Sequence, residues 1–453
     1  MSELFYISSR LAKVSCTDEE RERLLNYFVS LQEQPEKQAE FFRYAKKWKL
    51  APWLHTRMQR EGFTGYLSEE TSDAFREMHA VTLRANESRN KEAVLFLEKF
   101  REQNIEAAVL KGNLFAHTFY QDKGYKRMND FDILIHQEDW GKAQDVYAEL
   151  NYIPMGFGWS GEKQKAAKFS HTGIPFISRN FHCIAGTQWG IKSPTTHYKV
   201  NLEEAWATAG DYDFCGVKTK QLSPEYNLLH LVLHMGIYKC GIRDCMDVYN
   251  LVQAEPMDED KLVDLFQRTD CTDKAKFTLK MSQLCSGIPA ESLMKKLHAP
   301  GGFVARRLRN REKAINESGD IHTSYNDYFQ DVEKNVLYFN IVHRFHQKAI
   351  FYGRILRQIW LPEMEIALKF IDKAHRPTFL NKLSARLRAP GFVFAILAQE
   401  IGWGITFLLY TKLFFDQLFS LVNYFIPKES YFDYLKRIGV DPKQIKQVVS
   451  DVQ

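Results

Sequence analysis

The chain has 453 residues, of which 45% are hydrophobic, so it is long enough to form two or three domains with buried cores. Its 61 Lys and Arg residues exceed its 56 Asp and Glu residues by only five charges, too few for a dedicated nucleic-acid-binding protein unless they are clustered. Seven cysteines without a C-x-x-C spacing argue against a zinc-finger site and favour a reducing compartment. The first residues lack a basic segment followed by a hydrophobic one, so we expect a cytoplasmic protein.

Residues 1–95 are predicted to form a helical region, because hydrophobic residues recur there at helical spacing among interspersed charges. The segment TDEERERLLNYFVSL begins with a capping signal, in which Thr17 is the N-cap and Glu20 follows three residues later. This region carries no pattern that indicates chemistry. We therefore interpret it as a scaffold for the rest of the chain.

An α/β core is predicted over residues 96–210, beginning with a short hydrophobic strand at residues 107–110. A turn follows at Lys111, Gly112 and Asn113, and then a helix that carries Leu114, Phe115, Thr118 and Phe119. Such a turn can hold phosphate, since glycine lets the backbone approach a ligand closely and a helix start offers free N–H groups. Lys111 adds a positive charge to this expected phosphate site.

Two carboxylates, Asp130 and Asp132, stand at the start of the hydrophobic run FDILI. Alternate residues of a strand share one face, which would place the two like charges about 6–7 Å apart, where they repel unless a cation lies between them. Oxygen ligands of this kind suit Mg²⁺, which takes one or two carboxylates together with water and substrate phosphates. The competing interpretation is a strand end with two solvated carboxylates. An amphipathic helix is predicted next, in HQEDWGKAQDVYAELNY.

These residues resemble the uncharacterised bacterial nucleotidyltransferases of the DNA polymerase β-like superfamily, which carry an L-K-G turn, a basic residue before D-x-D and a hydrophobic strand end. The corresponding residues here are Leu110-Lys111-Gly112, Lys126 with Arg127, and the run from Asp130 to Ile135. The resemblance is strongest over residues 105–152. It extends more diffusely to WKLAPWLHTRMQREG and to SPEYNLLHLVLHMGIYKCGIRDCMDVYNLV. The family usually has Arg four residues before the first Asp, where this chain has Lys126.

The resemblance implies an α+β fold in which a small mixed sheet of the nucleotidyltransferase type is embedded between N-terminal and C-terminal helical regions. It also implies transfer of a nucleoside monophosphate from Mg-NTP to a hydroxyl group on a protein, glycan or small-molecule acceptor. Asp130 and Asp132 would be the catalytic ligands of Mg²⁺ or Mn²⁺. The nucleotide would be bound by Lys111, Gly112, Asn113 and Arg127. No specific nucleic-acid binding is predicted.

A third carboxylate, which superfamily catalysts usually take from a following strand, is missing where we would expect it. The strand-like segment FHCIAGTQWGI has no acidic residue, and Glu203 is only a weak candidate for the base. The alternative function is therefore a catalytically degenerate member that binds nucleotide or a partner without chemistry, with contact to a membrane surface as a further option.

The segment 163–202 contains six Lys or Arg residues and no Asp or Glu, which predicts a positively charged face. One interpretation is a surface for a triphosphate or an anionic acceptor, formed by Arg179, Lys192 and Lys199. The other is a solvated patch on loops.

Three further patterns have simpler explanations than the chemistry they suggest. The segment GFGWSG, residues 156–161, spells a dinucleotide fingerprint but lacks the acidic residue about 20 positions later. His230 and His234 are spaced for metal binding, yet they lack the Glu of H-E-x-x-H and are interpreted as packing histidines. Arg243 and Asp247 are interpreted as an ion pair on a helix surface unless Asp247 faces the site.

Helices are predicted to resume over residues 211–330, where a charged linker ends the region, and over residues 331–453. The latter contains an apolar hairpin at 391–427. Its run from Phe392 to Tyr410 is long enough to span a bilayer. Gln399 and Glu400 lie at its middle, where a carboxylate costs about 2.5–3.5 kcal/mol to insert. We therefore expect a buried or partner-binding hairpin, with peripheral membrane contact as the alternative.

Overall fold

The computed structural model describes residues 3–155, 170–192, 194, 196–235, 241–287, 291–298, 378–401 and 431–451, and single residues between 301 and 415. The chain divides into two compact units. The first comprises residues 1–154, 171–192 and 199–322, and the second comprises residues 155–170, 193–198 and 323–453. The domain boundaries at 95, 210 and 330 stay predictions. The segment GFGWSG and most of the charged linker lie outside the described residues.

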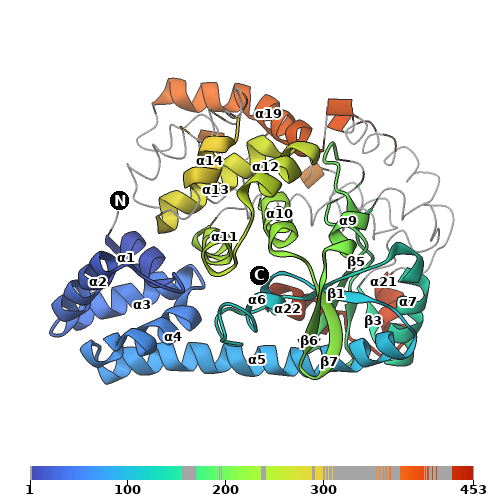
Figure 1. The fold of residues 1–453 in the computed structure, drawn as a ribbon, viewed down its shortest axis with the longest axis horizontal. Coiled ribbons are helices and arrows are strands. Elements are labelled where there is room, and N and C mark those ends of the chain that lie inside the picture. The colour runs from blue at the N-terminus through green and yellow to red at the C-terminus, as the bar shows by residue number, and fades with distance from the viewer. Residues whose placement is uncertain are drawn as a thin grey trace. The chain divides into compact units, whose positions relative to one another are not determined.

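The first unit begins with helices, as the sequence predicts. Thr17 caps the second helix, and both hydrogen bonds of its capping box with Glu20 are present, which confirms that prediction. The helix α5 contains 34 residues and extends beneath the preceding helices and the sheet (Figure 1). These elements are α1 (Glu3–Leu11), α2 (Asp18–Leu31), α3 (Pro35–Lys47), α4 (Ala51–Glu61), η1 (Phe63–Tyr66) and α5 (Glu69–Glu102).

A mixed sheet forms the centre of this unit, which confirms the predicted α+β fold. Its described strands are β1 (Ala107–Val109), β2 (Phe131–Ile135), β3 (Ile153–Pro154), β4 (Phe176–Ile177), β5 (Ile184–Gln188), β6 (Gly210–Phe214) and β7 (Val217–Gln221). They are arranged in the order β3-β4-β5-β2-β1-β7-β6. In the middle of this sheet, β2 is antiparallel to β1 and parallel to β5. Every residue of β2 and β5 is buried, so both strands belong to the core.

Short helices join the strands of the sheet. They are α6 (Lys111–Phe115), η2 (Gln137–Asp139), α7 (Trp140–Glu149) and α9 (Leu202–Ala207). Aromatic residues fix the sheet against the long helix: the ring of Phe96 on α5 lies 5.7 Å from that of Phe131 on β2 and 5.6 Å from that of Tyr147 on α7. The predicted amphipathic helix after β2 is therefore present as α7. The predicted helix after β1 ends at Phe115, earlier than expected.

A second group of helices follows the sheet in the first unit. It consists of α10 (Pro224–His234), α11 (Ile242–Ala254), α12 (Glu259–Arg268), α13 (Thr272–Ser286) and α14 (Glu291–Lys296). The hydroxyl of Ser223 accepts a hydrogen bond from the backbone N–H of Tyr226, and Pro224 occupies the first turn. This is the start that the Ser-Pro pair predicts.

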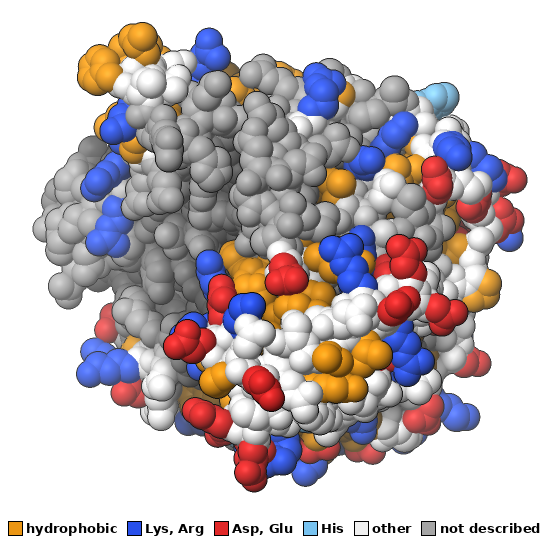
Figure 2. Space-filling model, turned by 90° about the vertical axis from the view of Figure 1, so that its left-hand side faces the viewer, with side chains coloured by type: hydrophobic (Ala, Val, Ile, Leu, Met, Phe, Trp, Pro, Cys, Tyr) orange, Lys and Arg blue, Asp and Glu red, His pale blue; other side chains and the backbone are white. Residues whose placement is uncertain are grey.

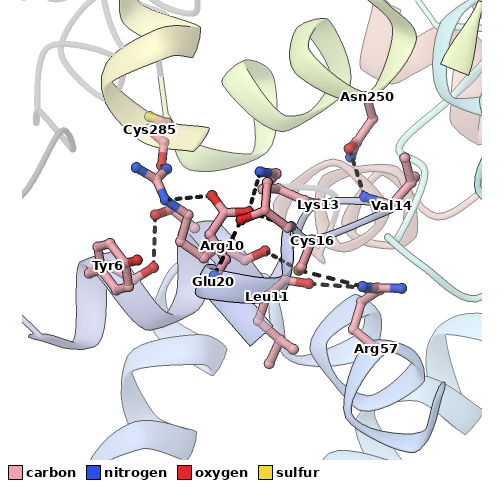
Figure 3. Close-up of polar contacts among 12 residues, drawn as sticks. Tyr6, Arg10, Leu11, Lys13, Val14, Cys16, Glu20, Arg57, Asn250 and Cys285 are labelled. Carbon is pink, nitrogen blue, oxygen red and sulfur yellow. Dashed lines mark hydrogen bonds and ion pairs between the residues drawn. The ribbon is translucent and has the colours of Figure 1, made fainter. Parts of the chain in front are cut away.

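The N-terminal helices are tied to this second group by polar contacts with the chain just after α1 (Figure 3). The side chain of Asn250 on α11 accepts a hydrogen bond of 2.8 Å from the backbone N–H of Val14 and donates one of 3.2 Å to the carbonyl of Ala12. Arg10 donates to the carbonyl of Cys285 at the end of α13 over 2.6 Å. Glu20 pairs with the side chains of Arg10 and Lys13. Segments more than 200 residues apart in sequence are thus joined.

The second unit contains α19 (Phe379–Ile401), α21 (Tyr431–Arg437) and α22 (Pro442–Asp451). Helix α19 begins before the predicted hairpin, includes the basic segment that precedes it, and contains Pro390. Most of residues 402–427 lie outside the described part of the chain, so the hairpin stays a prediction. Among the residues described, none of the helices has the length and apolar character needed to cross a membrane.

Asn250 provides a test of how the two helical groups are joined. Its side chain is fully buried and also donates a hydrogen bond of 3.1 Å to the hydroxyl of Tyr120. Replacing Asn250 by Ala leaves buried donors and acceptors without partners, which should lower the free energy of unfolding by about 2–3 kcal/mol. Chemical denaturation measures this change. The control is Gln267→Ala on the exposed side of α12, for which we expect less than about 0.5 kcal/mol, and equal losses for both variants would contradict this account.

Candidate functional site

The turn after β1 and the start of β2 lie side by side because these strands pair antiparallel, with Val109 opposite Ile133. The chain turns at Lys111, whose φ of 50° lies in the left-handed region that non-glycine residues seldom adopt. Gly112 is buried, and a Cβ atom there would stand 2.7 Å from Sδ of Met128. A larger residue here would displace the ends of the Met128 and Lys126 side chains, so glycine lets the loop before β2 pack closely onto the turn.

Five of the six predicted site residues, Gly112 among them, come together at this turn. The ammonium group of Lys111 lies 3.0 Å from Oδ2 of Asp132, which is the second residue of β2 and only 9% exposed. The side chain of Asn113 donates a hydrogen bond of 3.1 Å to the backbone carbonyl of Asp130. Asp130 itself is half-buried and directly precedes β2. Arg127, by contrast, lies on the exposed side of the loop.

The neighbouring strand β5 supplies residues that sequence reasoning did not assign to the site. Asp132 is in register with Gly186, where a Cβ atom would stand 2.7 Å from Oδ1 of Asp132. Two residues later, the amide of Gln188 donates a hydrogen bond of 3.0 Å to the same oxygen. Both oxygens of this carboxylate therefore have partners. The strand has no acidic residue, as its sequence indicated, and Glu203 is exposed on α9.

The ion pair with Lys111 explains how Asp132 tolerates burial. The side chains of the two residues are only 17% and 12% exposed, so water screens their attraction weakly. Asp130 and Asp132 suit a Mg²⁺ ion, which needs only one or two protein carboxylates when a substrate supplies the remaining oxygens. The described residues contain no cluster of three or more metal-binding side chains. A metal ion would therefore depend on these two groups, and Lys111 would have to move from Oδ2.

The loop before β2 is held by Asn86 on α5. Its amide donates hydrogen bonds of 2.7 and 2.8 Å to the carbonyls of Lys123 and Lys126, and its oxygen accepts one of 3.1 Å from the backbone N–H of Met128. The oxygen also accepts a hydrogen bond of 2.8 Å from the buried guanidinium of Arg89. One side chain thus positions three loop residues that lead into Asp130.

Asp247 corrects a sequence interpretation. The side chain is 5% exposed, and it forms an ion pair with Lys126 and accepts a hydrogen bond of 2.8 Å from Tyr120. It is therefore not part of a surface pair with Arg243 on the same helix. Its partner could not be seen in the sequence because Lys126 is 121 residues away. This buried pair joins α11 to the loop before the carboxylates.

A second anchor lies at the start of the same loop. Nε2 of His79 is 2.9 Å from Oδ1 of Asp122, and the hydroxyl of Thr56 donates to the other oxygen. Burial acts to raise the pKa of Asp122, but the hydrogen bonds from His79 and Thr56 bring it below its usual value. The ring of His55 lies 5.4 Å from that of His79, and burial followed by the charge of His79 lowers the pKa of His55 to about 4.

The segment without acidic residues, 163–202, was predicted to offer Arg179, Lys192 and Lys199 to an anionic ligand, and these three residues differ in their surroundings. Lys192 donates a hydrogen bond of 3.0 Å to the carbonyl of Leu233 on α10, whereas Arg179 and Lys199 are exposed. The rings of His230 and His234 lie 6.4 Å apart, and His230 is buried in the helix packing. On the face that Figure 2 shows, basic and acidic side chains are interspersed, so their charges largely offset one another there.

One comparison with known proteins identifies a family for this chain. A family model described as "Uncharacterised nucleotidyltransferase" matches residues 34–287, which is more than half of the chain. The matched span includes the turn, both carboxylates, β5 and Asp247. No curated protein and no solved structure matches the chain.

The buried ring of His55, which lies beside this anchor, predicts a dependence of stability on pH. The unfolded chain binds a proton to this histidine below about pH 6.5, whereas the folded chain binds it only near pH 4. The contribution of His55 to the free energy of unfolding should therefore not change with pH above 6.5. It should fall as the pH is lowered from 6.5 towards 4. His117 and His171, whose pKa values burial also lowers to about 4, contribute in the same direction.

Thermal unfolding between pH 7 and pH 5 measures this dependence. His55→Leu should show a smaller fall in Tm over this range than the unchanged protein. The exposed His182 provides a control, since His182→Leu should keep the full fall. If the slope of Tm against pH were the same in His55→Leu, the account of this anchor would be wrong.

The buried pair of Lys126 and Asp247 predicts a large loss of stability when one partner is removed. Lys126→Met leaves the Asp247 carboxylate buried without its cation, which should cost about 3–5 kcal/mol of unfolding free energy. The double variant Lys126→Met with Asp247→Asn should lose much less than the sum of the single losses. A double-mutant cycle by chemical denaturation measures the difference, and additive losses would show that the two side chains do not interact.

Proposed function

Because the chain belongs to a family of uncharacterised nucleotidyltransferases, we propose that it transfers a nucleoside monophosphate from an NTP to a hydroxyl group of an acceptor. The proposal includes membership of the DNA polymerase β-like superfamily and Mg²⁺ or Mn²⁺ bound by Asp130 and Asp132. The observation that supports it is the ion pair of 3.0 Å between Lys111, at the turn, and Asp132, on the strand. This contact unites the cation and the carboxylate that such chemistry needs.

In the proposed reaction, the acceptor hydroxyl oxygen attacks the α-phosphorus and forms a new P–O bond. The bond from that phosphorus to the oxygen bridging it to the β-phosphate breaks, and pyrophosphate leaves with the electron pair. The hydroxyl proton passes to a base. When bound, the metal ion would supply electrostatic stabilisation of the charge that develops on the phosphate.

The residues of the turn have separate roles in this proposal. Lys111, once released from Asp132, contacts the β- and γ-phosphates as pyrophosphate forms, and Arg127 approaches them from the exposed loop. Asn113 holds the backbone of Asp130 through its hydrogen bond of 3.1 Å. Gly112 keeps the turn close to the loop, as its lack of a side chain allows.

The base that accepts the hydroxyl proton does not come from β5, where Gly186 and Gln188 adjoin Asp132. We propose Glu203, which is exposed at the start of α9, and therefore expect slow transfer. The same observation favours a second candidate function. A catalytically degenerate member, with Asp132 held by Lys111 and Gln188, would bind nucleotide or a partner without transferring anything.

The acceptor is a protein, glycan or small molecule in this proposal, and the protein acts in the cytoplasm. Peripheral contact with a membrane through residues 391–427 remains part of the second candidate function. Nothing in the proposal requires specific nucleic-acid binding.

The test is to incubate purified protein with α-labelled NTPs, Mg²⁺ or Mn²⁺ and cell extract as the source of acceptor. We expect metal-dependent transfer of label, which Asp130→Asn combined with Asp132→Asn abolishes because the metal ligands are lost. Asp145→Asn, at an exposed position on α7, serves as a matched control and should retain transfer.

Two results would change this conclusion. Transfer that persists in the double variant would refute the assigned site. Metal-dependent binding of nucleotide without transfer, for all four NTPs, would favour the degenerate member.

A further inference from the structure

The chain beyond β5 places a second lysine against helix α10. Lys192 lies four residues beyond β5, the strand that contacts Asp132, and its ammonium group donates a hydrogen bond of 3.0 Å to the carbonyl of Leu233 in the last turn of α10. Three residues earlier on the same helix is His230, so one helical turn separates the two positions. The lysine from the segment without acidic residues is thus fixed beside a buried histidine.

His230 is unusual because it is buried without satisfying all its polar atoms. The residue is 2% exposed, and its Nδ1 atom has no hydrogen-bond partner among the residues that the structure describes. A buried polar atom without a partner costs free energy, so such an atom calls for an explanation. Binding of a ligand that hydrogen-bonds to the ring would provide one.

The charges around His230 indicate the sign of that ligand. Burial, and after it the charge of Lys111, with further effects of His171 and Lys192, hold the pKa of His230 well below its usual value. Burial and the charges of Lys192 and Lys111 likewise lower the pKa of His171 to about 4, while the Asp132 carboxylate acts in the opposite direction. Both rings therefore experience the same two lysines, in surroundings where positive charge outweighs negative.

His171 is placed at this position by the sheet. Its carbonyl accepts a hydrogen bond of 2.8 Å from the backbone N–H of Trp189, the residue directly after β5. The next residue, Thr172, forms a bridge with Gln188, whose amide contacts Asp132. The two histidines thus come from different elements: His171 lies in the segment beside β5, and His230 lies on α10.

We propose that Lys111, Lys192 and His230 form the binding site for the phosphate groups of the nucleotide, with His171 at its border. The site takes a polyphosphate chain, because the two ammonium groups offer charge and the neutral imidazole offers one N–H donor. The sequence assigned the nucleotide to Lys111 and Arg127, and a surface for a triphosphate or an anionic acceptor to Arg179, Lys192 and Lys199. The two histidines are new to this site. The inference rests on the proposed function, since it names the part of the NTP that these residues bind.

Tripolyphosphate in the presence of EDTA is the probe, because it has the charges of the nucleotide but needs no metal ion. Isothermal titration calorimetry on the full chain should detect binding. We expect Lys192→Met and His230→Phe each to raise Kd at least tenfold. Lys192→Arg, which keeps the positive charge, should raise Kd less than Lys192→Met does. The control is Lys218→Met, whose lysine is exposed on β7 towards the end of the sheet away from Lys111. Its Kd should not change.

The outcomes separate this inference from the proposed function. Unchanged Kd in folded Lys192→Met overturns the inference, as does absence of tripolyphosphate binding at millimolar concentration. Should His230→Phe fail to fold, the lysine variants decide. Asp130→Asn with Asp132→Asn should keep metal-free binding of tripolyphosphate. If that binding depends on Lys192 while label transfer and Mg-NTP binding are absent, the phosphate site stands and the proposed function fails.

Discussion

The contact between the Lys111 ammonium group and the Asp132 carboxylate depends on the antiparallel pairing of β1 with β2. That register places Lys111, two residues after β1, beside the first residues of β2. The carboxylate is desolvated at the start of a buried strand, which is costly unless a cation lies nearby. The turn therefore serves the fold as well as any ligand, because the same lysine neutralises a charge that the sheet has buried.

Helix α11 connects this site to the rest of the first unit. Its Asp247 binds Lys126 in the loop before β2, and its Asn250 binds the chain between α1 and α2. Tyr120 contacts both of these side chains. Since α5 holds the same loop through Asn86, the position of Asp130 depends on helices that come before and after the sheet in sequence. The family match over residues 34–287 covers the sheet together with α5 and α11, and therefore both of the helices that hold the loop before β2.

The carboxylate site is less complete than two-metal chemistry would require. Gly186 and Gln188 occupy the strand beside Asp132, so the site offers one carboxylate pair, one cation and one amide. In the proposed function, these groups bind a metal-nucleotide complex. Transfer also needs a base that accepts the hydroxyl proton. The enzyme would have such a base, and the degenerate member would lack it. The proposed phosphate site of Lys111, Lys192 and His230 would serve the enzyme and also a degenerate member that binds nucleotide, because both bind the phosphate groups of the nucleotide.

Local patterns in the sequence determine several features of this protein by themselves. The capping box at Thr17, the Ser-Pro start of α10, the strand with alternating Asp130 and Asp132, and the turn at Lys111 all depend on residues within a few positions of one another. Backbone propensity and periodicity act over that range, so the sequence predicts these features by itself. The resemblance to the nucleotidyltransferases adds the expectation of an α+β arrangement. The partners of the buried charges are different. Lys126 and Asp247 are 121 residues apart, and Gln188 reaches Asp132 over 56 residues. Only the strand order and the packing of α11 bring such groups together, because side chains pair wherever tertiary contacts remove water from both of them.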